Sequence, residues 1–299
     1  MIYFCADDYG LSEKSCTRIE TCLKDGVLNK ISVLPNGEIS HIDKRLQNSG
    51  ALLSLHINLV EGKPISAPAE VGLLVSSEGY FKHSFGGLLL MSLSFKRKEF
   101  QEQIYTEIRN QLKFMREFTC GDYCMAIDSH QHTHMIPLIY KAMMRAVKDE
   151  GVRVNYLRIP AEPLTPYLLS PSLYLTYAPA NLIKQWLLKF FALLNKKETK
   201  KAKIKPTYFM GVLFSGKMDE NRVTKVLPHY IRLAKKRGRD LEVLFHPGYI
   251  ESSQDLFDKN KSGFNKFYLS KGRKIEFDTL TSLEFKNNFM KEACENALP

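Results

Sequence analysis

The sequence predicts an α/β fold with about seven parallel strands, close to the eight strands of a closed (β/α) barrel. Two observations support this prediction. Short apolar runs alternate with amphipathic segments along the whole chain, which is typical of parallel strands joined by crossover helices. With 299 residues, 44% of them hydrophobic, the chain is large enough to bury one barrel core, and global disorder is excluded.

Each predicted strand is a short apolar run that stops at polar or turn-forming residues. The first ends at the acidic pair Asp7 and Asp8, and the last ends at His246. The carboxyl ends of parallel strands meet at one edge of a sheet, so we expect these polar residues to share that rim. The runs lie at 2–6, 31–34, 52–59, 125–128, 152–159, 207–212 and 241–245.

The segments between the strands predict helices, because apolar residues recur at spacings of three and four. The clearest case is 100–118, where Ile104, Ile108, Leu112 and Met115 form one stripe. The other predicted helices lie at 12–24, 41–47, 137–150, 221–236 and 283–297, and residues 62–96 form a less regular excursion. No internal repeat and no linker is visible, so we expect residues 1–299 to form a single domain.

The formal net charge of +11 favours anionic partners such as phosphorylated substrates, nucleic acid or a membrane surface. No recognition motif accompanies the charge, so we expect no nucleic-acid partner. The six cysteines lack zinc-ribbon spacing and are interpreted as reduced thiols. Without a signal peptide or an apolar run of about 20 residues, we expect a cytoplasmic protein, and a homodimer is left open.

Titratable residues follow five of the predicted strands. An aspartate at such a junction is usually a helix N-cap and a lone histidine is usually a core residue, but Asp7 and Asp8 cannot both be caps. His130, His132 and His134 occupy alternate positions, so they would line one face of an extended segment. Burying three imidazoles together without a cation would waste their hydrogen-bonding capacity. We therefore expect a metal or catalytic role for 128–134.

Histidines and carboxylates without a convergent cysteine suit Zn²⁺, Co²⁺, Ni²⁺, Mn²⁺ or Fe²⁺. A catalytic site needs about three protein ligands and an open position for water, which one aspartate and two histidines can provide. A bound metal lowers the pKa of its water and polarises a carbonyl. A second carboxylate and a free histidine could then act as general base and general acid. The sequence therefore predicts a metal-dependent hydrolase.

Five motifs occur in a fixed order from residue 6 to residue 249. They are Asp-Asp-Tyr-Gly within 6–12, His-Ile-Asn within 56–64, Asp-Ser-His within 128–134, Leu-Arg-Ile-Pro at 157–160 and His-Pro-Gly-Tyr at 246–249. Together they resemble the YdjC-like carbohydrate deacetylases, a family with chito-oligosaccharide and hopanoid-type glycolipid deacetylases. The resemblance implies a distorted (β/α) barrel related to that of NodB-like polysaccharide deacetylases. It also implies hydrolysis of an N-acetyl group from an amino sugar, which releases acetate.

The resemblance further implies the metal ligands and the base. Asp8, His56 and His130 match the positions that bind one divalent metal ion, with Mg²⁺ or Zn²⁺ as the expected ion. Asp7, the first aspartate of the pair, matches the base.

Two further roles are expected by analogy with the wider deacetylase group. Arg158 would orient the base, and His246 would be the general acid that protonates the departing amine. His132, His134 and Glu61 are expected to bind the substrate.

Two rival functions remain. The first is another metal-dependent hydrolase of the amidohydrolase type, but such enzymes place a His-x-His after the first strand, where this chain has Asp-Asp. The second is a non-catalytic sugar- or membrane-binding protein on a decayed barrel, although every candidate site residue is retained.

Residues 163–206 are interpreted as a subgroup-specific insertion. Between 184 and 205 there are eight lysines and one acid, Glu198, and Trp186 and Phe190 are among the apolar residues that precede most of the lysines. A basic amphipathic helix of this kind can lie on an anionic membrane, which would place the protein at the inner membrane surface with a glycolipid substrate. The alternative is a helix packed on the barrel, followed by a solvated lysine loop.

Overall fold

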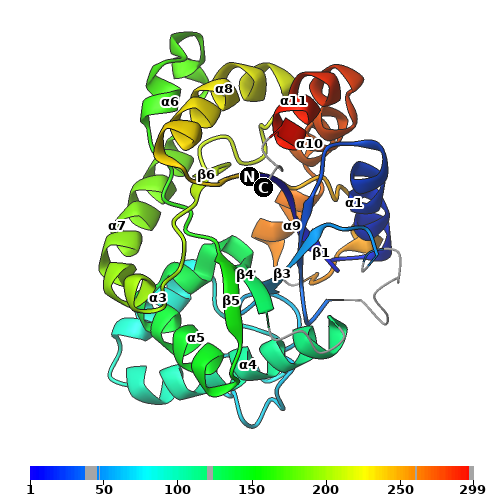
Figure 1. Cartoon of the computed structure of the whole chain (residues 1–299). Coiled ribbons are helices and arrows are strands. Elements are labelled where there is room, and N and C mark those ends of the chain that lie inside the picture. The colour runs from blue at the N-terminus through cyan, green and yellow to red at the C-terminus, as the bar shows by residue number, and fades with distance from the viewer. Residues whose placement is uncertain (38–45, 47, 120–123, 260, 296–299) are drawn as a thin grey trace.

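We describe the fold from a computed structural model that covers residues 1–37, 46, 48–119, 124–259 and 261–295 (Figure 1). Seven strands form one sheet in the order β5-β4-β3-β2-β1-β7-β6, and all neighbouring strands pair in parallel. In this described part, β5 and β6 are the two edges of the sheet. The sheet therefore curls into a half-barrel and does not close, which confirms the prediction of a distorted barrel with about seven strands.

All seven predicted strands are present, with shifted ends. The first strand continues past the predicted end, so the acidic pair lies inside β1 and not after it. The third strand ends two residues earlier than expected, one residue after His56. The strands are β1 (Ile2–Tyr9), β2 (Lys30–Val33), β3 (Leu52–Ile57), β4 (Cys124–Ser129), β5 (Arg153–Leu157), β6 (Tyr208–Met210) and β7 (Leu241–Phe245).

Five predicted helices are confirmed within a few residues. The helix α1 begins where the Ser12 hydroxyl accepts a hydrogen bond from the Ser15 amide, and α8 ends at Gly238 in the left-handed conformation that favours glycine. The predicted helix at 41–47 lies almost entirely outside the described residues. The five are α1 (Glu13–Asp25), α4 (Arg97–Phe118), α5 (Pro137–Asp149), α8 (Glu220–Arg237) and α11 (Leu283–Glu295).

The irregular regions contain further helices. The excursion at 62–96 ends in α3 (Phe85–Leu93). The segment interpreted as an insertion forms α6 (Thr165–Leu168), the 3₁₀ helix η2 (Pro171–Thr176) and the long helix α7 (Pro179–Lys201). Helices that were not predicted follow the last strand: η3 (Ser253–Asp255), α9 (Ser262–Tyr268) and α10 (Lys271–Thr281).

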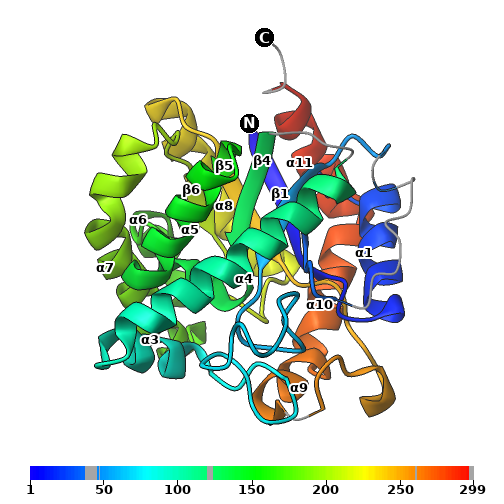
Figure 2. The same ribbon diagram turned by 90° about the horizontal axis from the view of Figure 1, so that it is seen from below.

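One large apolar cluster joins the strands to the helices around them. Ile104, Ile108 and Leu112 of α4 are buried in it, as the stripe at 100–118 predicts. Figure 2 shows α4 and α5 covering the sheet on the side of β4 and β5. The helices cover the outer surface of the sheet, so the carboxyl ends of the strands remain available for a site.

Candidate active site

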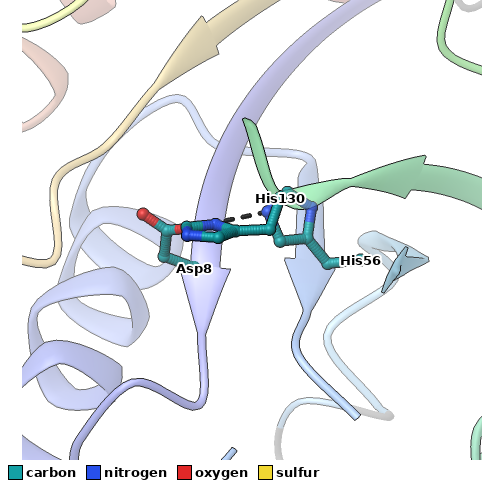
Figure 3. A group of neighbouring side chains, drawn as sticks. All are labelled: Asp8, His56 and His130. Atoms are coloured by element: carbon teal, nitrogen blue, oxygen red, sulfur yellow. Dashed lines mark hydrogen bonds and ion pairs between the residues drawn. The ribbon is translucent and has the colours of Figure 1, made fainter. Parts of the chain in front are cut away.

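The carboxyl ends of β1, β3 and β4 bring Asp8, His56 and His130 together (Figure 3). One potential ligand atom from each residue lies within 4.8 Å of the other two. Asp8 Oδ1 is 2.9 Å from His130 Nδ1 and 3.4 Å from His56 Nε2. All three side chains are buried. The residues that were predicted as metal ligands are therefore neighbours.

A distortion of β1 explains how two successive aspartates reach one cavity. In a regular strand, Asp7 and Asp8 would point to opposite faces of the sheet. The register between β1 and β2 shifts between Ala6 and Tyr9, and Asp8 has a φ of 72°, in the left-handed region. An irregularity of this kind redirects side chains. As a result, both carboxylates line the same cavity.

The ring of His56 is oriented as a metal ligand would be. Its Nδ1 donates a hydrogen bond of 2.6 Å to Asp128 Oδ1. Its Nε2 is buried without a hydrogen-bond partner and faces Asp8. A carboxylate that fixes the tautomer of a histidine and leaves the other nitrogen free is a common support for a metal-ligating histidine. The donor set of two imidazoles and one carboxylate therefore fits a divalent ion.

The buried charges around these ligands also fit a cation. The groups that contact the cluster, directly or through one another, are five carboxylates and three cationic side chains, all of them buried. A divalent ion would balance this excess of negative charge, which is costly in a dry interior. The carboxylates are Asp7, Asp8, Glu61, Asp128 and Glu242, and the cations are Lys30, Arg158 and Arg273.

Asp7 lies beside the ligand cluster and is hydrogen-bonded to Arg158. Arg158 donates two hydrogen bonds, of 2.7 and 2.8 Å, to the two oxygens of Asp7. Burial raises the pKa of Asp7, but Arg158 and His56 outweigh this effect, so the pKa lies below its usual value. Glu242 holds the guanidinium from the other side at 2.6 Å. The carboxylate is therefore ionised and fixed in place.

His246 lies after the end of β7 and lines the same cavity as Asp7 and Asp8. Its backbone amide donates to Glu276 Oε2, which lies 3.5 Å from the ring Nδ1. The ring packs edge-on against Phe267, with 5.3 Å between the ring centroids. This placement leaves the imidazole at the cavity, where a proton donor is expected.

The cavity has a volume of about 200 Å³. It is lined by Asp7, Asp8, His56, His130 and His246, and α9 contributes the aromatic rings of Phe264, Phe267 and Tyr268. A lining that is both polar and aromatic suits a ligand that has both polar and apolar surface. The other lining residues are Gln131, His132, Lys184, Gly211, Val212, Ser215 and Gly263.

The prediction that residues 128–134 form an extended segment with three histidines on one face is wrong. Residues 130–135 form the 3₁₀ helix η1 (His130–Met135), in which Gln131 and His132 have positive φ angles of 55° and 61°. This backbone points the three rings in different directions. His132 lines the cavity, and its Nδ1 is buried without a hydrogen-bond partner. Burial and the nearby Lys184 lower the pKa of His132, so the ring is neutral.

The other two residues expected to bind substrate do not line the cavity. His134 is buried and accepts from the Ser129 hydroxyl at 2.5 Å, while its Nε2 donates to the Arg158 carbonyl at 2.8 Å. Both ring nitrogens are therefore engaged in hydrogen bonds within the protein. Glu61 accepts a hydrogen bond of 2.5 Å from the Tyr268 hydroxyl and lies 3.3 Å from His130 Nε2. Glu61 therefore lies next to the ring nitrogen of His130 that does not face Asp8.

Several residues of the site were missed by the sequence analysis. Glu242 is a charged residue inside the otherwise apolar strand β7, which was an available signal, and Lys30 is the first residue of β2. Asp128 lies in the segment 128–134, for which a metal or catalytic role was expected, but its hydrogen bond to His56 was not predicted. Arg273 contacts Asp8 from α10, a helix that the sequence pattern did not predict.

Among the basic residues, Lys184 is the one whose position differs most clearly from the prediction. It was grouped with the surface lysines of 184–205, but it lines the cavity together with Asp7 and Asp8. No hydrogen bond or ion pair of its ammonium group is found within the described part of the chain. Burial lowers its pKa, and the carboxylates of Asp7, Glu162 and Asp8 oppose this effect. The ammonium group is therefore available to a bound ligand.

The curled parallel sheet and the Asp-His-His cluster at its carboxyl edge define a class: an α/β half-barrel with a candidate divalent-metal centre. Within this class, the YdjC-like protein family matches residues 1–291, so the chain belongs to that family. The resemblance seen in the five sequence motifs is thereby confirmed.

Two curated relatives illustrate the similarity to other proteins. The carbohydrate deacetylase of Danio rerio is 26% identical over 159 residues, which cover 52% of this chain and 49% of the relative. The carbohydrate deacetylase of Thermoanaerobacter pseudethanolicus is 32% identical over 131 residues, 42% of this chain and 48% of the relative. The chain thus spans about half the length of the curated relatives it matches.

A solved structure shows the same fold. The crystal structure of a proposed cellobiose-phosphate cleavage protein from Enterococcus faecalis aligns with a TM-score of 0.66 and 18% identity. The alignment covers 97% of this chain and 94% of that protein. At this identity, the likeness supports the fold alone.

Proposed function

We propose that this protein is a metal-dependent carbohydrate deacetylase, which hydrolyses an N-acetyl group on an amino sugar and releases acetate. The supporting observation is the unpartnered Nε2 of His56, aimed at Asp8 and His130 beside the Asp7–Arg158 pair. The names of the two relatives agree with this reaction. The Asp-Asp pair at the end of β1 does not favour an amidohydrolase-type site, in which a His-x-His is expected.

Asp8, His56 and His130 would hold the metal ion. Of the two ions considered, Zn²⁺ suits two imidazoles and a carboxylate better than Mg²⁺, which prefers oxygen ligands. A bound ion would supply Lewis-acid polarisation of the acetyl carbonyl and a water of lowered pKa.

The chain's own residues would move the protons. Asp7 accepts the proton of the attacking water, and Arg158 keeps that carboxylate in position as a positioning residue. A C–O bond forms at the acetyl carbon as the C–N bond breaks. His246 gives a proton to the departing nitrogen, so that the products are acetate and the free amino sugar.

Lys184 and His132 would bind the sugar or the oxygen on which negative charge develops. Both line the cavity, and each has a polar atom without a partner within the described residues. Preorganised donors of this kind stabilise charge in the transition state. A free oligosaccharide and a lipid-linked sugar are both accommodated by this proposal, as are a cytoplasmic location and a homodimer.

The test is to incubate the metal-loaded protein with N-acetylglucosamine, diacetylchitobiose and an N-acetylglucosaminyl lipid. We expect release of acetate and loss of one acetyl group in the mass spectrum of at least one substrate. His56→Ala should abolish this release together with bound metal, while the exposed variant Lys24→Gln should leave both unchanged. Release of ammonia or phosphate, or full activity of His56→Ala, would contradict the proposal.

A further inference from the structure

The helix α7 has apolar side chains on two faces, and only one face is covered by the rest of the protein. Leu188 and Phe191 on the covered face are buried. The other face exposes 53–70% of each of its apolar side chains. Their spacings of three, four, three and one place them on one stripe of the helix. The exposed residues are Ile183, Trp186, Phe190, Leu193 and Leu194.

Neighbouring elements extend this stripe into a larger surface. Leu90 and Leu93 of α3 are 71% and 74% exposed, and Phe95 just after α3 is 94% exposed. Both ribbon views place α3, α6 and α7 along the same side of the molecule (Figures 1 and 2). The stacked rings of Phe85 and Phe191, 6.5 Å apart, join α3 to α7.

The segment before α7 adds exposed apolar residues to the same side. They are Leu168 of α6, Leu169, and Tyr174 and Leu175 of η2. We call the exposed residues of α3, α6, η2 and α7, with Phe95 and Leu169, the apolar face. Most of the large apolar side chains that are exposed in the described part of the chain belong to it. Exposed apolar side chains gathered on one side of a protein are typical of an interaction site.

A row of lysines runs beside the stripe on α7. Lys189, Lys196 and Lys200 are exposed, and their spacings of seven and four place them on one line of the helix. For the described residues, no hydrogen bond or ion pair of these ammonium groups is found. Lys197 and Lys201 extend the positive charge, while Glu198 is the one acid on the helix. The apolar face is therefore bordered by uncompensated positive charge.

The positive charge continues beyond the end of α7. The helix α5 packs against α7 through a hydrogen bond of 2.7 Å between the hydroxyls of Tyr140 and Thr199. A groove of about 810 Å³ next to this contact is lined by several basic side chains. They are Lys141, Arg145, Lys148, Arg153 and Lys201, and they outnumber the two acids in the lining, Asp149 and Glu198. This region would attract anionic groups near the apolar face.

From these observations, we propose that the apolar face docks the protein peripherally on an anionic phospholipid bilayer. Aromatic and aliphatic side chains such as Trp186 and Phe190 would enter the interface between headgroups and acyl chains, and the lysines would contact the phosphates. Within the described residues, no helix has the length and apolarity needed to cross a bilayer.

A second copy of the chain fits this face less well than a membrane does. In a two-fold symmetric dimer, the same surface is present on both partners. Each partner would then bring a row of lysines to the same interface, and an excess of like charge at an interface is costly. An anionic bilayer satisfies the apolar stripe and the lysines together. The docking proposal uses no catalytic residue and does not depend on the proposed reaction.

The test is co-sedimentation with vesicles of phosphatidylglycerol and phosphatidylcholine in equal parts, and with phosphatidylcholine alone. We expect binding to the anionic vesicles at 0.1 M salt that weakens at least about tenfold at 1 M salt, where the Debye length falls to about 3 Å. Binding to phosphatidylcholine alone should be weaker by a similar factor.

Two sets of variants separate the apolar and charged contributions. Trp186→Gln with Phe190→Gln should weaken binding at least about tenfold, whereas Ile275→Gln with Leu283→Gln, which removes exposed apolar residues elsewhere, should not. Lys189→Gln, Lys196→Gln and Lys200→Gln together should remove the salt-sensitive part of binding. The matched control replaces the exposed Lys24, Lys235 and Lys236 by Gln.

Three results would overturn the proposal. The first is a failure of the wild-type protein to sediment with anionic vesicles at low salt. The second is binding of the Trp186 and Phe190 variant that is as tight as that of the wild type. The third is a dimeric wild type and a monomeric Trp186 and Phe190 variant in light scattering, which would assign the face to a second copy. Thermal melts establish that each variant is folded. Acetate release from a soluble substrate is measured separately, so loss of docking is distinguished from loss of the reaction.

Discussion

His56 and Asp128 are register partners on the adjacent strands β3 and β4, and their side chains meet in a hydrogen bond of 2.6 Å. Strand pairing alone places the carboxylate beside the imidazole. Asp128 also accepts a hydrogen bond of 2.6 Å from Lys30 Nζ. Burial raises the pKa of Asp128, but the positive charges of Arg158 and Lys30 outweigh this effect, so the pKa lies well below its usual value. The carboxylate that supports His56 is therefore ionised at neutral pH.

Asp128→Asn should weaken metal binding by about 10–100-fold, because it removes the support of His56 and leaves the three candidate ligands in place. Competition with a chelator of known affinity measures the effect. Glu162→Gln is a suitable control, since Glu162 is equally buried but accepts from the amides of 211–213. Unchanged metal affinity in Asp128→Asn would contradict the role of Asp128 as the support of a metal-ligating His56.

The two successive aspartates should give opposite phenotypes. Asp7→Asn should retain metal and reduce kcat by about 10²–10⁴-fold, because it removes a general base. Asp8→Asn should lose metal affinity, because it removes a candidate ligand. Metal analysis after gel filtration, combined with acetate release, separates the two effects. If Asp7→Asn loses metal and Asp8→Asn retains it, the assignment of the two roles is reversed.

Lys184→Met should reduce kcat/KM for deacetylation by at least about tenfold while metal content stays normal, because an ammonium group at the cavity is lost. Lys184→Arg should recover part of the rate if positive charge is what the ligand needs. Lys189→Gln removes an exposed lysine from the same helix and should have no effect on a soluble substrate. Equal rates for Lys184→Met and wild type would place this lysine outside the reaction.

Metal binding should release protons and become tighter as the pH rises. Burial lowers the pKa of His130, but Asp8 and Glu61 outweigh it and raise the pKa to about 9 in the metal-free site. The ring is therefore protonated at neutral pH and must lose its proton to become a ligand. Below pH 9, the affinity should rise by about tenfold per pH unit for one released proton.

Calorimetric titration of the metal in two buffers with different ionisation heats measures this release. We expect at least about one proton per ion bound at pH 7. The His130→Gln variant should bind metal weakly and release fewer protons. Metal binding without any proton release in the wild type would contradict a role for His130 as a ligand.

The amino-acid sequence by itself determined the strands, most of the central helices and the rim on which the site lies. These features depend on local periodicity, on turn residues and on the common direction of parallel strands, all of which can be read over short stretches. The acids and histidines at the strand ends, with Asp7, Asp8 and His56 among them, could therefore be predicted to converge.

Tertiary structure decided the contacts that hold the site in its working geometry. Arg273 contacts Asp8 across 265 positions of the chain, and no local pattern encodes a contact of that separation. The left-handed backbone at Gln131 and His132 divided three histidines that a strand would have aligned. Lys184 lines the cavity because the packing of α7 decides which face of this helix lies inward. Helical periodicity alone leaves that choice open when both faces are apolar.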